Sequence, residues 1–274
     1  MLDVELDLAS SLARAAAAAI LAVKSTARAH SSDKADHSPV TAADLAADRV
    51  IRAGLDRFKI DSGNDDVIVT EETFTTGPLP ARGRVWIVDP LDGTRDFVAG
   101  SVDYVVQIAL VVDGVPRLGV VCQPETGRLW RAIVGERCEH VDANNVVTTY
   151  GAGRSAAGAA PRFAVSVSHP SAFIDNLGDA MKAVMIPRGS VGLKIGAILD
   201  DEADGYVTDS RHIKVWDTAA PAAILLAAGG TITSLSGAPL RYDRDVAHDD
   251  GVAAFGSMGE HWRLALQTTL STLR

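Results

Sequence analysis

Two aspartates, Asp89 and Asp92, stand three residues apart after an apolar stretch of the chain. Carboxylate oxygens are hard ligands that suit a small divalent cation. Gly93 and Thr94 follow at once and are typical of a short helix start, where unpaired N–H groups and the helix dipole favour a phosphate. The stretch therefore indicates metal-assisted phosphate chemistry. Taken alone, the same spacing also fits aspartates that only cap a helix.

The residues before this pair predict how it is positioned. Residues 85–88 (Val-Trp-Ile-Val) are apolar and rich in β-branched side chains. This composition predicts a buried strand. Because Pro90 cannot donate a hydrogen bond to a neighbouring strand, we expect the strand to end at Asp89 and a turn to carry both carboxylates.

Three other acidic residues stand at the ends of predicted elements. Asp44 follows Thr41 by three residues, a variant capping box, and falls on the apolar stripe of the helix that begins there. Glu71 ends a short predicted strand, where acidic residues are usually only solvated. Asp217 begins a long apolar helix and is a natural N-cap. From spacing alone, a capping or solvated role is the simpler interpretation for each.

The remaining patterns outline an α/β chain whose first strands form an antiparallel meander packed on the first two helices. The expected helices and strands follow the sequence in this order: helix 3–29, a helix after Thr41, strands 67–70, 104–112, 118–123 and 129–134, strand 163–167, a helix to about 183, strand 205–207, a helix from Asp217 to Gly229-Gly230, short strands within 231–256 and a helix over 258–272. Residues 151–161 are small and polar, which predicts a linker or loop.

A basic segment, Arg188-Gly189-Ser190 followed by Lys194, lies in the second half of the chain. Gly189-Ser190 predicts a helix start whose N–H groups could face an anion, with Lys194 nearby. A Gly-Ser turn beside a surface lysine explains the pattern equally well.

The composition excludes some classes of protein. The chain has 274 residues and a formal net charge of -9, which argues against a nucleic-acid surface. Two cysteines do not make a disulfide framework, so we expect a reducing cytoplasm. The apolar run over residues 15–23 is too short to span a bilayer and follows acidic residues, so we expect neither a signal peptide nor a membrane segment.

Four segments together resemble the inositol monophosphatase superfamily. They are Lys34 to Asp44, Glu71-Glu72, Asp89-Pro90-Leu91-Asp92-Gly93-Thr94, and Trp216-Asp217-Thr218-Ala219-Ala220 with Gly229-Gly230. The resemblance covers residues 10 to 260, approximately. It implies a layered αβαβα sandwich, with an N-terminal α+β half over residues 1–155, a C-terminal α/β half over residues 156–274 and the site in the cleft between them.

The resemblance also implies the site. Glu71, Asp89 and the Leu91 carbonyl would hold one Mg²⁺, while Asp89, Asp92 and Asp217 would hold a second; the resemblance implies two or three Mg²⁺ per site. A donor set made only of oxygen itself favours Mg²⁺ over zinc. Gly93 and Thr94 N–H groups would steady the phosphate. Glu71 and the Thr94 hydroxyl would position or deprotonate the attacking water with Asp44 behind them, and Li⁺ would inhibit.

The chain departs from the superfamily pattern at two positions. Thr70 stands where Gly is usual, so the backbone approach there is expected to differ. Pro221 stands where Gly is common; in a first helical turn its missing N–H costs little, so we do not expect it to disable the site.

The substrate is less well indicated than the chemistry. Asp92 to Phe97 (Asp-Gly-Thr-Arg-Asp-Phe) is similar to the bacterial 3'(2'),5'-bisphosphate nucleotidases, which implies 3'-phosphoadenosine 5'-phosphate as the small-metabolite substrate. Arg188, Lys194 and His169, with Ser190, would then hold the second phosphate. Inositol-1-phosphate or histidinol phosphate stays open, because Glu is absent before Trp216 and no aromatic obviously stacks adenine. A silent binding protein is a remote alternative. Family members are often dimers, and the sequence shows no interface.

Overall fold

The computed structural model describes residues 2–26, 31–33, 39–150, 160–167, 170–257 and 259–273. The helices within these residues are α1 (Asp3–Thr26), α2 (Ala42–Ser62), α3 (Thr94–Val98), α4 (Ala172–Met181), α5 (Val191–Leu199), α6 (Val215–Ala227) and α7 (Glu260–Leu273). The strands are β1 (Ser31–Asp33), β2 (Pro39–Thr41), β3 (Val67–Thr70), β4 (Arg84–Asp92), β5 (Val105–Val112), β6 (Val115–Cys122), β7 (Leu129–Ile133), β8 (Arg137–Val141), β9 (Val147–Thr149), β10 (Arg162–Ser166), β11 (Val184–Arg188), β12 (Gly205–Thr208), β13 (Thr231–Thr233) and β14 (Val252–Phe255).

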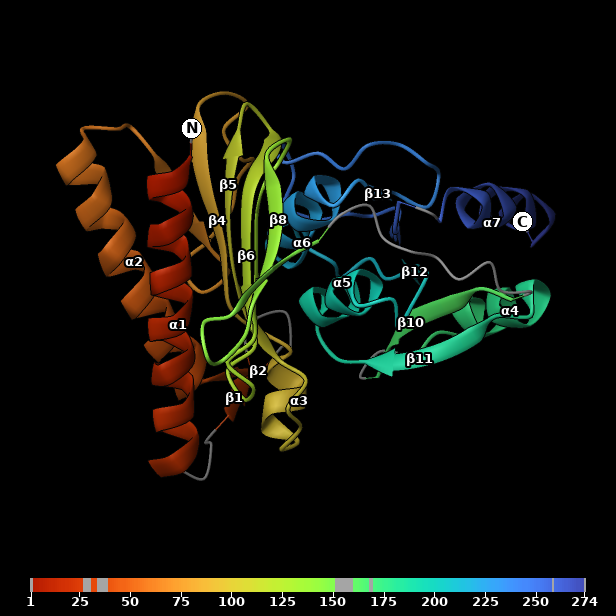
Figure 1. The fold of residues 1–274 in the computed structure, drawn as a ribbon, viewed down its shortest axis with the longest axis horizontal. Helices are drawn as coiled ribbons and strands as arrows, with labels where there is room; N and C mark the ends of the chain where they lie inside the picture. Colours follow the sequence, from red (N-terminus) through yellow and green to blue (C-terminus); the bar gives the residue numbers. More distant parts are fainter. Residues whose placement is uncertain are drawn as a thin grey trace.

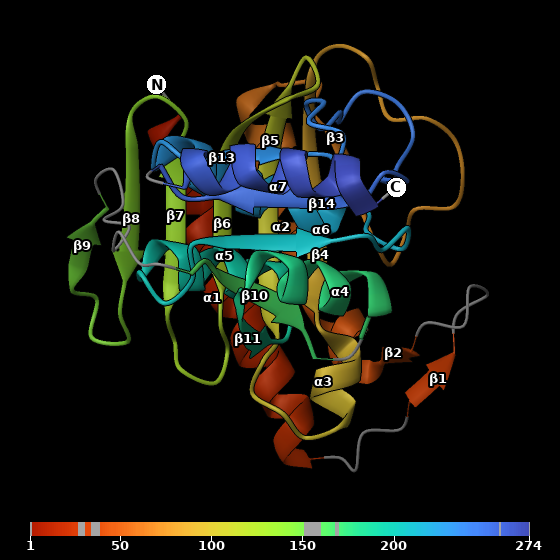
Figure 2. The same cartoon turned by 90° about the vertical axis from the view of Figure 1, so that its right-hand side faces the viewer.

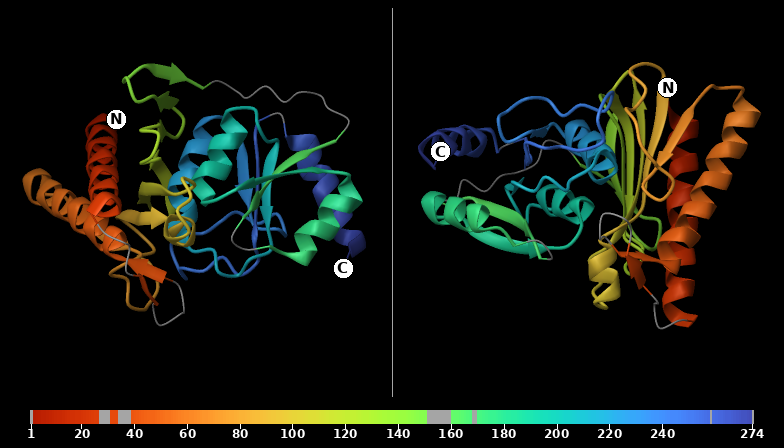
Figure 3. Two further views of the ribbon diagram at one scale, coloured as in Figure 1. Left: turned by 90° about the horizontal axis from the view of Figure 1, so that it is seen from below. Right: turned by 180° about the vertical axis from the view of Figure 1, so that it is seen from behind.

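The chain stacks in five layers of alternating helices and sheets (Figure 1). Helices α1 and α2 cover one face of a seven-stranded sheet, α5 and α6 fill the space between that sheet and a five-stranded sheet, and α4 and α7 cover the far side (Figures 2 and 3). This confirms the predicted αβαβα sandwich. The predicted boundary between the halves, at residue 155, lies outside the described residues.

The seven-stranded sheet has the order β3-β4-β5-β6-β7-β8-β9. Only β3 and β4 pair in parallel, and the rest form the predicted antiparallel meander. Asp113 and Gly114, both with positive φ, make the predicted hairpin turn between β5 and β6. The sequence interpretation missed β8 and β9, which are short and carry polar residues.

Strand β4 shows how the sheet is buried on both faces. Trp86 and Val88 pack in the core beneath α1 and α2, while Val85 and Ile87 pack in the core beneath α5 and α6. Successive strand residues point to opposite faces, so a continuous apolar run is what a doubly covered strand requires. The predicted burial of this run is confirmed.

The five-stranded sheet has the order β11-β10-β12-β14-β13 and is mixed. Strand β10 pairs in parallel with β11 and β12, and β14 pairs antiparallel with β12 and β13. The parallel pairs are joined through helices, as βαβ crossovers require. This is the predicted C-terminal α/β half; β11 was not predicted.

Helix α1 is long and apolar enough, by length and composition alone, to cross a membrane. A core helix passes the same test, and Leu6, Ala13 and Ile20 on α1 are fully buried against the sheet. The apolar face of α1 is therefore accounted for by packing within the chain.

Pro221 is not in the first turn of its helix, and this expectation was wrong. Helix α6 begins at Val215, so Pro221 stands in the second turn. Proline there cannot donate the backbone hydrogen bond that the Asp217 carbonyl would receive in a regular α-helix. Helix α6 nevertheless packs tightly, because Gly119 on β6 lets its backbone approach: a Cβ at Gly119 would lie 2.4 Å from the Ala220 carbonyl oxygen.

Candidate active site

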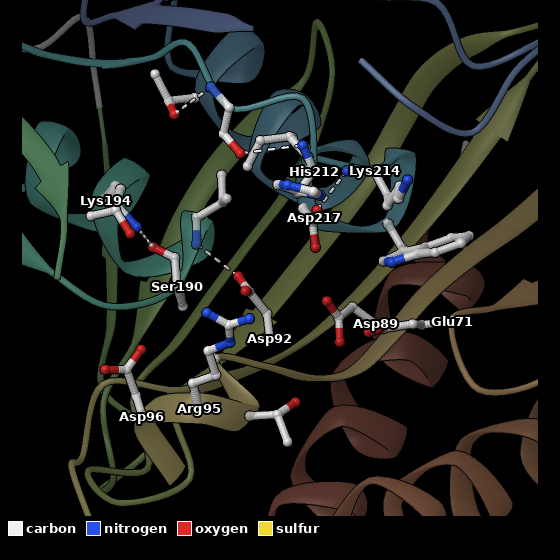
Figure 4. Close-up of a pocket in the computed structure, with 18 of the residues that line it drawn as sticks. Glu71, Asp89, Asp92, Arg95, Asp96, Ser190, Lys194, His212, Lys214 and Asp217 are labelled. Atoms are coloured by element: carbon white, nitrogen blue, oxygen red, sulfur yellow. Dashed lines mark hydrogen bonds between the residues drawn. The ribbon is translucent and has the colours of Figure 1, made fainter. Parts of the chain in front are cut away.

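A cavity of about 420 Å³ lies where the end of β4 meets the starts of α3, α5 and α6 (Figure 4). Most of the predicted site residues line it: Glu71, Asp89, Leu91, Asp92, Gly93, Thr94, Ser190, Lys194 and Asp217. The chain therefore brings together acids that are far apart in the sequence.

A β-bulge explains why Asp89 and Asp92 share one face of β4. Residues three apart on a regular strand point to opposite faces. Here Asp89 pairs with Gln107 and Asp92 with Val105, so three steps along β4 match two along β5. The extra residue turns Asp92 to the side of Asp89. The strand thus continues to Asp92, instead of ending at Asp89 as expected, because the bulge accommodates Pro90.

Asp89, Asp92 and Asp217 each present one oxygen to a common space, and these oxygens lie within 4.8 Å of one another. Figure 4 shows the three side chains converging there, with Glu71 beside Asp89. Burial raises the pKa of Asp92 to about 6 and raises that of Asp217 well above its usual range. Repulsion from Glu71 contributes to both of these shifts in pKa, and the Asp217 carboxyl hydrogen-bonds to Asp89. A cation would relieve this repulsion.

Each of the three carboxylates is fixed by a backbone N–H group. Asp89 Oδ1 accepts from Leu91 N at 3.0 Å, and Asp217 Oδ2 accepts from Lys214 N at 2.6 Å. Asp92 Oδ2 accepts from Val191 N at 2.7 Å. A carboxylate has two oxygens, so each can keep this contact and still offer a ligand atom.

The start of α5 faces an anion that belongs to the chain itself. Val191 N and Gly192 N both donate to Asp92 Oδ2, at 2.7 and 3.4 Å. Negative charge at a helix N-terminus is favourable, so this contact joins α5 to the end of β4. Ser190 lines the cavity with φ of 42°, and its hydroxyl accepts from Leu193 N at 3.0 Å.

Lys194 is buried and lines the cavity, so the alternative of a surface lysine is wrong. Its Nζ donates to the Ser190 carbonyl at 2.8 Å and lies 5.4 Å from the centre of the Tyr206 ring. Burial lowers the pKa of Lys194 to about 8, while the Asp92 charge acts in the opposite direction. A buried ammonium beside a cavity is suited to bind an anion that enters it.

Asp44 reaches the site through Thr94. The Thr94 hydroxyl lies 3.0 Å from Asp44 Oδ1 and 3.1 Å from the Leu91 carbonyl oxygen. The capping box is also present, because Asp44 Oδ2 accepts from Thr41 N at 2.8 Å. Asp44 is therefore both a cap and a partner of a cavity residue.

The structure does not bring Arg188 to the cavity. Its guanidinium donates to Glu202 at 2.6 Å, on the surface, and Arg188 is not among the described residues that line the cavity. His169 lies outside the described residues. Thr70 is buried and its hydroxyl contacts that of Thr73 at 2.8 Å, so the departure from Gly is accommodated within the turn after β3.

Sequence reasoning missed several lining residues with polar or charged side chains: Arg95, Asp96, Ser166, Tyr206, Thr208, Ser210, His212 and Lys214. His212 and Lys214 immediately precede the segment that carries Asp217, which was a usable signal. Tyr206 and Thr208 carried no such signal, because only the pairing of β12 next to β10 places that strand beside the cavity.

The comparisons with known proteins decide the family. The model of the inositol monophosphatase family matches residues 1–270. The chain belongs to the inositol monophosphatase family. It is therefore related to metal-dependent phosphoric monoester hydrolases that act on small phosphorylated metabolites.

The relatives of this chain include bacterial proteins that are named as nucleotidases. The chain is 32% identical over 212 residues to the 3'(2'),5'-bisphosphate nucleotidase CysQ of Buchnera aphidicola subsp. Acyrthosiphon pisum (strain APS), covering 76% of each chain. It is 34% identical over 193 residues to the 3'-phosphoadenosine 5'-phosphate phosphatase of Mycobacterium leprae (strain TN), covering 65% of each.

Solved structures have the same fold. CysQ from Bacteroides thetaiotaomicron, a bacterial member of the inositol monophosphatase family, matches with a TM-score of 0.75 and 27% identity, over 92% of this chain and 97% of that one. Inositol monophosphatase from Anabaena (Nostoc) sp. PCC 7120 matches with a TM-score of 0.76 and 23% identity, over 97% and 96%. The second likeness shows the fold alone.

Proposed function

We propose that the protein is a Mg²⁺-dependent phosphatase that removes the 3'-phosphate of 3'-phosphoadenosine 5'-phosphate, giving AMP and inorganic phosphate. The observation that carries this proposal is the 32–34% identity to relatives named as bisphosphate nucleotidases or 3'-phosphoadenosine 5'-phosphate phosphatases. The buried Lys194 beside the carboxylates supports it, because a bisphosphate brings a second charged group that a monophosphate lacks.

The donor set fits Mg²⁺. The side chains of Asp89, Asp92 and Asp217 offer only oxygen, and His or Cys is absent from the described cluster. Glu71, Asp89 and the Leu91 carbonyl would hold one ion, and Asp89, Asp92 and Asp217 would hold another. When bound, such ions lower the pKa of water and offset charge on the leaving oxygen.

The chain supplies the proton handling. Thr94 Oγ1 contacts Asp44 Oδ1, so the hydroxyl can donate its hydrogen bond to Asp44 and use a lone pair to accept one from a water in the cavity, which orients that water. Glu71 lines the same cavity and is a candidate general base that would accept a proton from the water that Thr94 orients. The Gly93 and Thr94 N–H groups would donate to phosphate oxygens.

The second phosphate is assigned to the basic side of the cavity. Lys194, His212 and Lys214 line it from α5 and from the segment between β12 and α6 (Figure 4). Lys194 was predicted for this role, whereas His212 and Lys214 are added here. Arg188, which pairs with Glu202, is not retained.

Phosphate release tests the proposal. The purified protein with Mg²⁺ is given 3'-phosphoadenosine 5'-phosphate, inositol-1-phosphate and histidinol phosphate in parallel, each with and without Li⁺. We expect the highest kcat/KM with the bisphosphate and inhibition by Li⁺. Preference for a monophosphate would refute the substrate but keep the phosphatase, and no release from any ester with Mg²⁺ bound would indicate a silent binding protein.

We also propose that the enzyme acts on a small metabolite in the cytoplasm, not on a nucleic acid polymer or at a membrane. We further propose that two copies of the chain form a homodimer, and that each chain is divided into an N-terminal and a C-terminal half near residue 155. Cys122 and Cys138 are buried free thiols, which supports a reducing compartment. The net charge of -9 supports a small-molecule partner over a polynucleotide. Fractionation of cells and sedimentation of the purified protein test the compartment and the dimer.

A further inference from the structure

Gln107 is a fully buried polar residue on β5 that lies beneath the carboxylate cluster. It is paired with Asp89 in the register of β4 and β5, and side chains of directly opposed residues point to the same face. Its Nε2 donates to Asp92 Oδ2 at 2.7 Å and lies 3.3 Å from the Asp217 carbonyl oxygen. One amide group therefore contacts both the end of β4 and the first turn of α6.

The Asp217 carbonyl is an acceptor that the helix itself cannot satisfy in the regular way. In an α-helix this oxygen accepts from the N–H of the residue four positions later, which is Pro221. Proline has no N–H, so the regular donor is missing. The Gln107 Nε2 group donates to the Asp217 carbonyl oxygen instead. Gln107 therefore replaces the donor that is lost because position 221 is a proline.

The orientation of the Gln107 amide is fixed by its surroundings. A flipped amide would place Oε1 against the Asp92 carboxylate and the Asp217 carbonyl, so three acceptors would face one another. In the observed orientation Oε1 has no hydrogen-bond partner within the part of the chain that the structure describes. An unpaired buried oxygen costs stability. The amide offsets that cost through the hydrogen bonds of its Nε2 group to Asp92 and to the Asp217 carbonyl, so its contribution lies at the two elements that carry these carboxylates.

We propose that Gln107 is a positioning residue for the metal site, acting through Asp92 and the start of α6. Together with Val191 N it fixes Asp92 Oδ2, and through the Asp217 carbonyl it fixes the turn that carries the third carboxylate. The two carboxylates are thereby held at a spacing that a cation can bridge. This inference rests on the proposed function only in that the cluster binds a divalent cation, and not on the identity of the phosphate ester.

Metal binding to the purified protein, without substrate, tests the proposal. Isothermal titration with Mg²⁺ and Mn²⁺ is compared for wild type, Gln107→Met and a matched control, Gln123→Met. Gln123 is also buried and donates to a backbone carbonyl, Val102, at 3.1 Å, but its side chain hydrogen-bonds to Val102 and Thr126 and not to Asp92 or Asp217. Loss of a residue that orients metal ligands weakens metal binding about 10–100-fold. We expect a loss in this range for Gln107→Met and less than about a twofold change for Gln123→Met.

Pro221→Ala tests the link to the helix. In the Gln107→Met background the restored N–H can bond the Asp217 carbonyl, so part of the lost Mg²⁺ affinity should return. In the wild-type background Pro221→Ala should change the Mg²⁺ affinity less, because Gln107 already donates to the Asp217 carbonyl oxygen. If Gln107→Met is poorly folded by circular dichroism, Gln107→Asn replaces it; the shorter amide cannot reach both acceptors and should weaken binding in the same direction.

The outcomes separate this inference from the proposed function. Wild-type Mg²⁺ affinity in the Gln107 variants overturns it, and so does an equal loss in Gln123→Met or the absence of any coupling between positions 107 and 221. A further expected result is that excess Mg²⁺ restores kcat in Gln107→Met without a change in KM for the ester. If wild type binds Mg²⁺ but does not hydrolyse the nucleotide, the substrate assignment fails while the metal affinities still decide the role of Gln107.

Discussion

The Thr94 hydroxyl lies 3.0 Å from Asp44 Oδ1, so a residue at the start of α3 is joined to one fifty positions earlier, at the start of α2. A hydroxyl has one proton, and Thr94 has two acceptors within reach, Asp44 and the Leu91 carbonyl. When Thr94 donates its hydrogen bond to Asp44, a lone pair of Thr94 can receive a hydrogen bond from water in the cavity. The capping role of Asp44 does not compete, because Thr41 N contacts its other oxygen.

Thr94→Val should therefore remove proton handling and leave the carboxylates in place. Positioned proton transfer contributes about 10²–10⁴-fold to rate. We expect kcat to fall by at least about 100-fold in Thr94→Val and by less than about tenfold in Thr94→Ser, with unchanged Mg²⁺ affinity in both. Steady-state kinetics and titration of Mg²⁺ measure this. A Thr94→Val enzyme with wild-type kcat would remove Thr94 and Asp44 from the mechanism.

Asp217→Asn should separate the stability of the metal-free protein from its response to metal. The amide removes the repulsion by Asp92 and Glu71 that, together with burial, raises the pKa of Asp217, so the chelated variant should melt no lower than chelated wild type. Wild type at Mg²⁺ one hundred times its Kd should gain about 2.7 kcal/mol, and the variant should gain much less. Asp61→Asn, on an exposed acid of α2, is the control. Equal Mg²⁺ shifts in both variants would contradict a metal site at Asp217.

Lys194→Met and Arg188→Gln form a matched pair for substrate recognition. Lys194 is buried in the cavity, whereas Arg188 pairs with Glu202 outside it. A charge-assisted hydrogen bond contributes about 1.5–3 kcal/mol, so KM for the bisphosphate should rise about 10–100-fold in Lys194→Met. In Arg188→Gln it should change less than about twofold. The reverse order, read from initial rates with 3'-phosphoadenosine 5'-phosphate, would restore the original prediction for Arg188.

The sequence predicted the acids of the site better than the way in which they meet. Val85 to Val88 form a continuous apolar run and α2 carries an apolar stripe of helical period, so their burial followed from pattern alone. The bulge that brings Asp92 beside Asp89 depends on pairing with β5, which a local pattern does not contain.

Residues set by tertiary contacts were the ones that could not be predicted. Ser190 was expected to open a helix facing a ligand anion. The first residue of that helix, Val191, instead donates to Asp92, ninety-nine positions earlier in the chain. Arg188 and Lys194 are both basic residues near that turn. Arg188 ends β11 and pairs with Glu202 on the surface, whereas Lys194 lies on α5 and is buried, and this difference depends on how the strand and the helix pack in the fold. Gln107 carried no motif at all, because its role depends on Pro221, which belongs to a different element.

His248 should make the protein sensitive to acid. Its Nε2 lies 2.8 Å from Thr218 Oγ1, and the Tyr242 hydroxyl donates to the same oxygen at 3.2 Å. Burial lowers the pKa of His248 to about 4 from its ordinary 6.5. Between these values the unfolded chain binds more protons than the folded one, so stability is lost as pH falls from 6.5 towards 4.

At pH 5 this group should cost about 2 kcal/mol relative to pH 7.5. Urea unfolding at both pH values measures the difference in the free energy of unfolding. We expect His248→Gln to be less stable than wild type at pH 7.5 but to lose less between pH 7.5 and 5, because glutamine does not titrate. His261→Gln, at an exposed position on α7, should keep the wild-type pH dependence. If His248→Gln and wild type lose the same stability on acidification, His248 is not the group that senses acid.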